Sequence, residues 1–140
     1  MTSYMMSDKV NIYLAGAMES AGGNMNFPLF DFVAAKLRAA GFEVCNPADL
    51  ARQHIGSLDQ IRKMSKQDLQ IASRELLWME LTWIRYKAKI LVLLPGWEQS
   101  AGAQIEKQLA EYYGVKVWQA PDVILLSDVE LDNILALAKE

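Results

Sequence analysis

Few residue types in this chain of 140 residues could carry chemistry. It contains one histidine, His54, and one cysteine, Cys45. An intrachain disulfide and a cysteine-based metal cluster are therefore excluded, and histidine-based triads or metal sites are disfavoured. We expect neither a metal nor a cofactor, and any catalysis must rest mainly on carboxylates.

One stretch combines an anion-binding pattern with a carboxylate: Ser100-x-Gly102-x-x-x-Glu106, shortly after the apolar run 90–94. Ser100 can cap the helix that follows, and the exposed amides of a first helical turn bind anions. These features predict a small anion site at this point in the chain. Capping alone is the alternative for Ser100.

Glu106 falls inside the apolar arc of this predicted helix. A carboxylate that faces inward costs free energy unless it is paired, hydrogen-bonded or functional. The small neighbours Gly102 and Ala103 leave space for a ligand in front of it. We therefore predict a catalytic role for Glu106, and a structural glutamate bonded to a tyrosine is the alternative. The apolar arc consists of Gly102, Ile105, Leu109, Ala110, Tyr112 and Tyr113.

A second candidate is the glycine-rich segment 16–23, after the first predicted strand. Its glycines let the backbone approach a ligand closely. It does not match G-x-G-x-x-G and contains no lysine or arginine. A flexible connection between strand and helix is the alternative.

Hydrophobic periodicity and turn residues predict the elements that position these segments. The long helix is expected to be capped by Ser57 or Asp59 and to break near residues 72–73, and Asp128 is expected to cap the last helix. Residues 48–56 are expected to form a loop. Helices are predicted at 27–40, 58–87, 101–113 and 129–139, and strands at 10–15, 42–45, 90–94, 115–118 and, as a fifth, 123–126.

Alternation of strands and helices is typical of an α/β fold. We expect residues 1–140 to form a single domain with a Rossmann-like, doubly wound parallel sheet of four to five strands flanked by helices. In such folds ligands bind outside the carboxyl ends of the strands. Both candidate segments lie there.

Composition narrows the functional classes. Apolar residues make up 52%, charged residues 22%, and the net charge is −3. This balance argues against a nucleic-acid polymer as partner, whereas a small anion remains compatible with it. No apolar run approaches the length of a membrane span, and the first residues lack a signal-peptide apolar region. We expect a cytoplasmic protein that does not engage a membrane.

These segments resemble the nucleoside 2-deoxyribosyltransferase superfamily, and in particular its branch of small phage and bacterial proteins. The resemblance covers about two thirds of the chain and rests on Ser100, Gly102 and Glu106 joined to the first strand. The superfamily includes transferases and 2'-deoxynucleoside 5'-monophosphate N-glycosidases. The matching stretches are YLAGAMES, NFPLFDFVAAKLRAAGFEVCNPADL and ILVLLPGWEQSAGAQIEKQLAEYYGVKV.

The resemblance implies an enzyme that cleaves, or transfers at, the N-glycosidic bond of a 2'-deoxynucleoside or its 5'-monophosphate. Glu106 would form a covalent deoxyribosyl intermediate. Tyr13 would orient Glu106 or the sugar. The implied substrate-binding residues are Ser100 and Gly102 for the 5'-phosphate or 5'-hydroxyl, Gly16, Ala17 and Met18 for the sugar and phosphate, and Trp97 for base stacking.

The chain departs from the family pattern at three positions. The family places an acid near the end of the helix before the central strand, and Glu80 is the best match here, at a spacing one residue longer. Lys89 stands where the family often has an aspartate. Glu19 stands where monophosphate-specific members carry an arginine.

Three further expectations concern alternative functions and the oligomeric state. A nucleotide-binding or sensing protein without turnover is the main alternative to an enzyme. A phosphoribohydrolase is disfavoured because the chain lacks the PGGxGT pattern. Large apolar residues crowd positions 76–86, which predicts a homodimer or higher homo-oligomer unless the last helix covers them.

Overall fold

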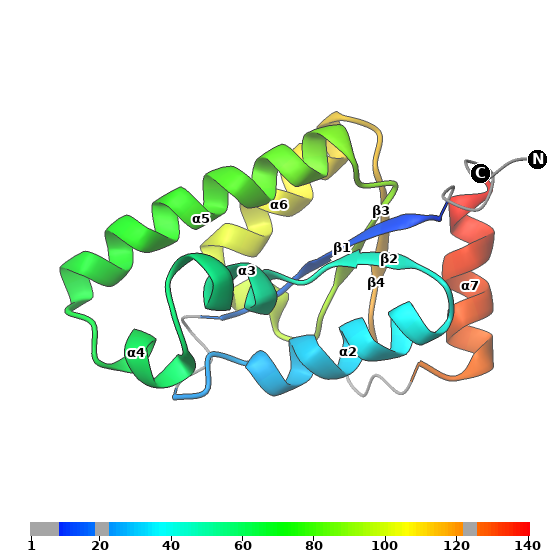
Figure 1. Cartoon of the computed structure of the whole chain (residues 1–140). Helices are drawn as coiled ribbons and strands as arrows, with labels where there is room; N and C mark the ends of the chain where they lie inside the picture. The colour runs from blue at the N-terminus through cyan, green and yellow to red at the C-terminus, as the bar shows by residue number, and fades with distance from the viewer. Residues whose placement is uncertain (1–8, 19–22, 122–125) are drawn as a thin grey trace, which may run out of the picture.

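A computed structural model describes residues 9–18, 23–121 and 126–140. Its centre is a parallel sheet of four strands in the order β2-β1-β3-β4 (Figure 1). The strands are β1 (Asn11–Ala15), β2 (Glu43–Cys45), β3 (Ile90–Leu93) and β4 (Lys116–Gln119). The predicted α/β fold with a Rossmann-like parallel sheet is confirmed.

The two faces of the sheet are covered by different helices. On one face, Ile12 and Leu14 pack with side chains of α2 (Phe27–Ala39) and α7 (Asp128–Ala138). On the other face, Tyr13 and Ala15 pack with side chains of α5 (Lys66–Tyr86) and α6 (Ala101–Tyr112). Alternate residues of β1 thus point to opposite layers, and Tyr13 points toward α5 and α6.

The central strand β3 is buried along its whole length, as its continuous apolar run predicts. It pairs with β1 from Ile12↔Ile90 to Ala15↔Leu93. Both strands end at the same edge of the sheet, so the segments after them, including the short 3-10 helix η2 (Trp97–Gln99), lie side by side. This edge positions the candidate site.

The predicted loop at 48–56 is wrong, because most of it is the helix α3 (Pro47–His54). The Asn46 side chain caps this helix by accepting a hydrogen bond from the Ala48 amide at 3.0 Å, and Pro47 occupies its first turn. Only a short stripe of small side chains is buried, so the periodicity was too weak to reveal a helix.

The predicted long helix is also interrupted in a different place. Ser57, one of the two expected caps, caps α4 (Leu58–Arg62) in a capping box. A second serine, Ser65, caps α5. The break therefore lies at residues 63–65, and α5 continues through residues 72–73. The second serine cap, with Asp68 in the first turn, explains where α5 begins.

At the C-terminal end, Ser127 rather than Asp128 caps α7, because its hydroxyl accepts the Glu130 amide in a capping box. The predicted fifth strand at 123–126 lies outside the described residues except for Leu126, which is not in a strand. No helix among the described residues is long and apolar enough to cross a membrane.

Candidate functional site

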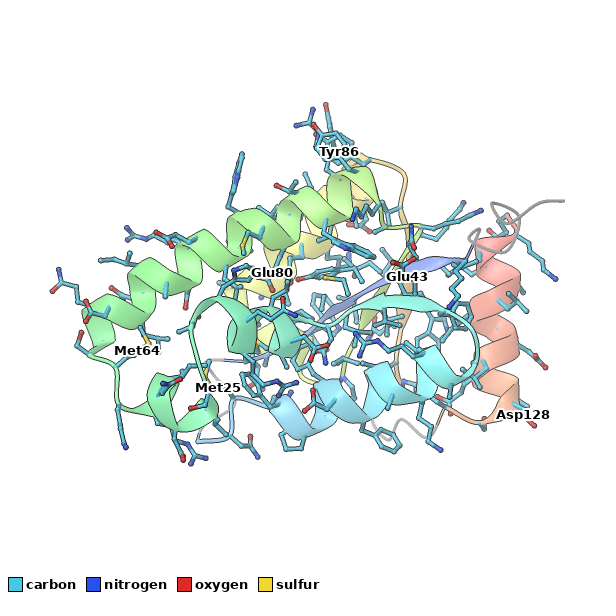
Figure 2. All side chains as sticks on the ribbon, viewed as in Figure 1. Met25, Glu43, Met64, Glu80, Tyr86 and Asp128 are labelled. Carbon is cyan, nitrogen blue, oxygen red and sulfur yellow. The ribbon has the colours of Figure 1, made fainter. Side chains whose placement is uncertain are left out.

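Three elements bring Tyr13, Glu80 and Glu106 together. Tyr13 is in the middle of β1 and is fully buried on the face beneath α5 and α6. Glu80 lies one turn from the buried Leu76 and Ile84 of α5, so helical periodicity turns it inward. Figure 2 shows Glu80 on the side of α5 that faces the rest of the fold.

Glu106 occupies the corresponding place on α6. It shares its buried face with Ala103 and Ala110, whose small side chains let α6 approach β1 and β3. Glu106 is 5% exposed and Glu80 is 8% exposed. Their burial is the condition under which two carboxyl groups perturb one another strongly.

The Tyr13 hydroxyl group contacts both carboxyl groups. Tyr13 Oη lies 2.9 Å from Glu80 Oε2 and forms a second short hydrogen bond with Glu106 Oε2. A phenol has one proton to donate, so it can donate to only one carboxylate at a time. The other contact needs a carboxyl proton that is donated to Tyr13 Oη. The arrangement therefore favours one proton held by the glutamate pair.

The electrostatics of the pair agree with this proton count. Burial raises the pKa of Glu80 to about 7, although the hydrogen bond from Tyr13 acts in the opposite direction. Burial, and then the nearby Glu80 charge, raise the pKa of Glu106 above its usual range. Burial and the two carboxylates also raise the pKa of Tyr13, so its hydroxyl stays protonated. The pair can thus supply one acid and one base near neutral pH.

A cavity of about 350 Å³ opens above this pair. Its volume is within the range of small-molecule sites. The walls come from the loop after β1 and from α2, α3, α5 and α6, and they are mostly apolar. The lining includes Gly16, Met18, Arg74, Glu80, Ser100, Gly102 and Glu106.

The N-terminus of α6 contributes polar groups to this cavity. Ser100 Oγ accepts a hydrogen bond from the Ala103 amide at 3.2 Å, which confirms Ser100 as the cap. The amides of Ala101 and Gly102 lie in the first helical turn, where no carbonyl of the helix can accept from them. Both residues line the cavity. An anionic or hydroxyl group bound there would satisfy these donors.

The two glycines at the site have different physical roles. A Cβ on Gly16 would lie 3.1 Å from Leu94 Cβ and 3.3 Å from Phe30, so packing disfavours a side chain there. A Cβ on Gly102 would have only Ser100 Oγ within 4 Å, at 3.8 Å. Packing therefore does not explain the absence of a side chain at Gly102, which leaves open space at the helix start.

Not every predicted residue lines the cavity. Tyr13 lies beneath it and contacts the two carboxyl groups. Ala17 is buried, and its carbonyl accepts from Asn26 Nδ2 at 3.0 Å. Trp97 packs against the apolar cluster beneath α6, with Lys107 Nζ 5.8 Å from its ring centroid. The structure thus does not bring Ala17 or Trp97 into the cavity lining.

Several lining residues were missed by the sequence reasoning. Arg74 and Leu77 of α5 were not singled out, although the inward stripe of α5 leads from Leu69 through Leu76 to Glu80 at helical spacing. That periodicity could have identified the wall. Lys89 precedes β3 and therefore lies at the opposite edge of the sheet from the cavity.

Comparison with known proteins gives one family. No curated protein and no solved structure gave a significant match to the chain. Residues 10–119 match the family described as a domain of unknown function, DUF4406, and this range contains every element from β1 to β4 as well as the three residues of the buried carboxyl site. The chain therefore belongs to the DUF4406 family.

Proposed function

We propose that the protein cleaves the N-glycosidic bond of a 2'-deoxynucleoside or 2'-deoxynucleoside 5'-monophosphate, in the manner of the nucleoside 2-deoxyribosyltransferase superfamily that it resembles. The observation that carries the proposal is the pair of buried carboxyl groups, Glu80 and Glu106, which share the Tyr13 hydroxyl at the floor of a cavity. Displacement at an anomeric carbon needs such a pair, one group as nucleophile and the other as acid.

The separation of the two carboxyl groups supports a covalent route. Each contacting oxygen lies within hydrogen-bond distance of Tyr13 Oη, so the two oxygens are at most about 6 Å apart. Enzymes that form a glycosyl intermediate hold their carboxyl groups about 5–5.5 Å apart, whereas direct attack by water needs about 6.5–9.5 Å. The pair at the cavity floor is too close for the second geometry.

In the first step, the proton of the pair is transferred to Glu80 through the Tyr13 hydroxyl group, the Glu106 carboxylate attacks C1' of the sugar, and the bond between C1' and the base nitrogen breaks. The electron pair of that bond goes to the base, and Glu80 donates its proton to the leaving nitrogen. The product is a deoxyribosyl ester of Glu106. Tyr13 holds the two carboxyl groups in register and donates to whichever is charged.

In the second step, an acceptor attacks C1' and releases Glu106 as a carboxylate. Glu80, now charged, takes the proton of the attacking group, so that the starting protonation state returns. Water as acceptor gives hydrolysis and a second base gives transfer. Both reactions use the same intermediate, and the proposal covers both.

The test is incubation with the four common 2'-deoxynucleosides and their 5'-monophosphates, followed by chromatography for free base. We expect base release from the wild type and none from Glu106→Gln or Glu106→Ala. Ribonucleotides are expected to react far more slowly, on the precedent of the superfamily. Glu75→Gln makes the same chemical change on the exposed side of α5 and should retain full activity.

The covalent intermediate gives a second measurement. Intact-protein mass spectrometry of a quenched reaction should show the chain plus one deoxyribosyl group, and peptide mapping should locate it at Glu106. Full activity of both Glu106 variants, or a label at another residue, would exclude Glu106 as the nucleophile.

A further inference from the structure

The cavity has one cationic side chain among its described lining residues, that of Arg74. Arg74 is exposed, and within the described part of the chain it has no hydrogen bond or ion pair. The loop at 16–23 contains no lysine or arginine. Among the described lining residues and the loop at 16–23, the positive side-chain charge therefore comes from α5.

The register of α5 and α6 places Arg74 opposite the start of α6. The two helices run side by side in the same direction (Figure 1). At their C-terminal ends, the Arg85 guanidinium lies 5.6 Å from the ring centroid of Tyr113. Arg74 precedes Arg85 by eleven positions, and Gly102 precedes Tyr113 by eleven. Eleven residues make about three turns, so the same register brings Arg74 level with Gly102, and both residues line the cavity.

The depth of Arg74 matches that of the helix start. Arg74 precedes Glu80 by six positions, and Ser100 precedes Glu106 by six. At a rise of 1.5 Å per residue, both lie about 9 Å along their helices from the carboxyl pair. In the proposed reaction C1' of the sugar lies at the carboxyl groups, and this interval is the part of the cavity that can take its C5' end.

We propose that Arg74 is the specificity-determining residue for a 5'-phosphate, so that the substrate class is 2'-deoxynucleoside 5'-monophosphates rather than free nucleosides. This inference rests on the proposed function. A phosphate monoester carries about −1.5 to −2 charges at neutral pH. The helix amides supply only partial charge, whereas the guanidinium supplies a full charge and two parallel donors for phosphate oxygens.

Direct binding isolates this contact from the base and from catalysis. Calorimetric titration should show that 2-deoxyribose 5-phosphate binds the wild type more tightly than 2-deoxyribose does. Arg74→Gln should remove about ten- to a hundredfold of that preference, the effect of losing a charge-assisted hydrogen bond. Arg74→Lys keeps the charge without the planar fork and should lie between the two. Arg85→Gln is the matched control, with the same charge change on the same side of α5, and should keep the preference.

Kinetics give the second readout. Arg74→Gln should raise KM for the monophosphates by a similar factor and leave cleavage of free deoxynucleosides nearly unchanged. No preference for the phosphate in the wild type, an undiminished preference in Arg74→Gln, or an equal loss in Arg85→Gln would each overturn the assignment. Failure of the proposed function is a separate result, namely no base release from any substrate, and the binding titration is independent of it.

Discussion

Glu80 and Glu106 come from different helices, yet both contact the same hydroxyl group, that of Tyr13. Because Tyr13 is fully buried in the central part of the sheet, either carboxyl group would lose this hydrogen bond by moving away from the hydroxyl. The shared hydroxyl therefore holds the two carboxyl groups close together.

The first prediction concerns the pH dependence of catalysis. Burial raises the pKa of Glu80 to about 7, and burial together with the Glu80 charge raises the pKa of Glu106 well above its usual range. The pair therefore holds two protons below about pH 7 and one above it, and only the one-proton state contains both a carboxylate and an acid. Log kcat/KM should therefore rise with pH up to about 7. Glu80→Gln should lower kcat and shift this acidic limb, with the largest loss for bases that are poor leaving groups. An unchanged acidic limb in Glu80→Gln would assign the ionising group to another residue.

The second prediction concerns the pH dependence of stability. The pKa of Glu80 is raised on folding from 4.5 to about 7, so the folded state binds more protons between these values. The stabilising contribution is complete below about pH 4.5 and is lost as pH rises to about 7. The melting temperature of the wild type should fall across this window. Glu80→Gln should show a shallower fall, because it removes one titrating group and its charge near Glu106, whereas Glu75→Gln should behave as the wild type.

Much of the fold and part of the site were predictable from sequence for identifiable reasons. Tyr13 lies on a strong strand pattern, and Glu106 follows a capped helix start. The helical wheel also placed Ile105 and Tyr112 inward, but they are 45% and 81% exposed. A helical wheel identifies the residues that share a face of the helix. It does not identify which part of that face packs against the sheet. Here the small residues Ala103 and Ala110 face the sheet.

Other features depended on contacts that no local pattern encodes. Arg74 belongs to the cavity only because α5 and α6 run side by side at a particular register. The helix α3 buries only short side chains such as Ala48 and Ala51, so its hydrophobic signal is weak. Both features depend on tertiary packing, which the periodicity of a single helix does not reveal.

The third prediction uses Gly102. An alanine there meets no atom closer than 3.8 Å, and alanine is more favourable than glycine in a helix by up to about 1 kcal/mol. Gly102→Ala should therefore unfold at the same or a higher temperature. Its methyl group, however, would enter the space at the helix start and raise KM. A variant that is more stable and fully active would show that this space is not used by the substrate.

The fourth prediction separates the capping role of Ser100 from substrate binding. Removing a serine cap costs about 1 kcal/mol of stability wherever it occurs. Ser65→Ala removes the cap of α5, away from the carboxyl pair, and serves as the matched control. Both variants should lose similar stability, but only Ser100→Ala should raise KM for monophosphates, by about tenfold or more. Equal kinetics in the two variants would leave Ser100 with a capping role alone.

The last prediction concerns assembly. The structure removes the alternative in which α7 covers the apolar residues of α5, because α7 packs beside β4 and on the other face of the sheet (Figure 1). Trp78 is 73% exposed, and Figure 2 shows Tyr86 projecting away from the fold. Further exposed apolar side chains are Ile71 on α5, Ile105 and Tyr112 on α6, and Tyr113 directly after α6.

We expect a second copy of the chain to cover this surface, because a closed symmetric dimer is the commonest way to bury such a patch. Light scattering at micromolar concentration should give at least twice the mass of one chain. Trp78→Lys should shift the protein toward the monomer, since it places a charge in the apolar contact. Phe32→Lys changes an exposed aromatic residue on α2, across the sheet, and should leave the mass unchanged. A wild type with the mass of a single chain would exclude the dimer, and equal dissociation by both variants would place the contact elsewhere than on α5 and α6.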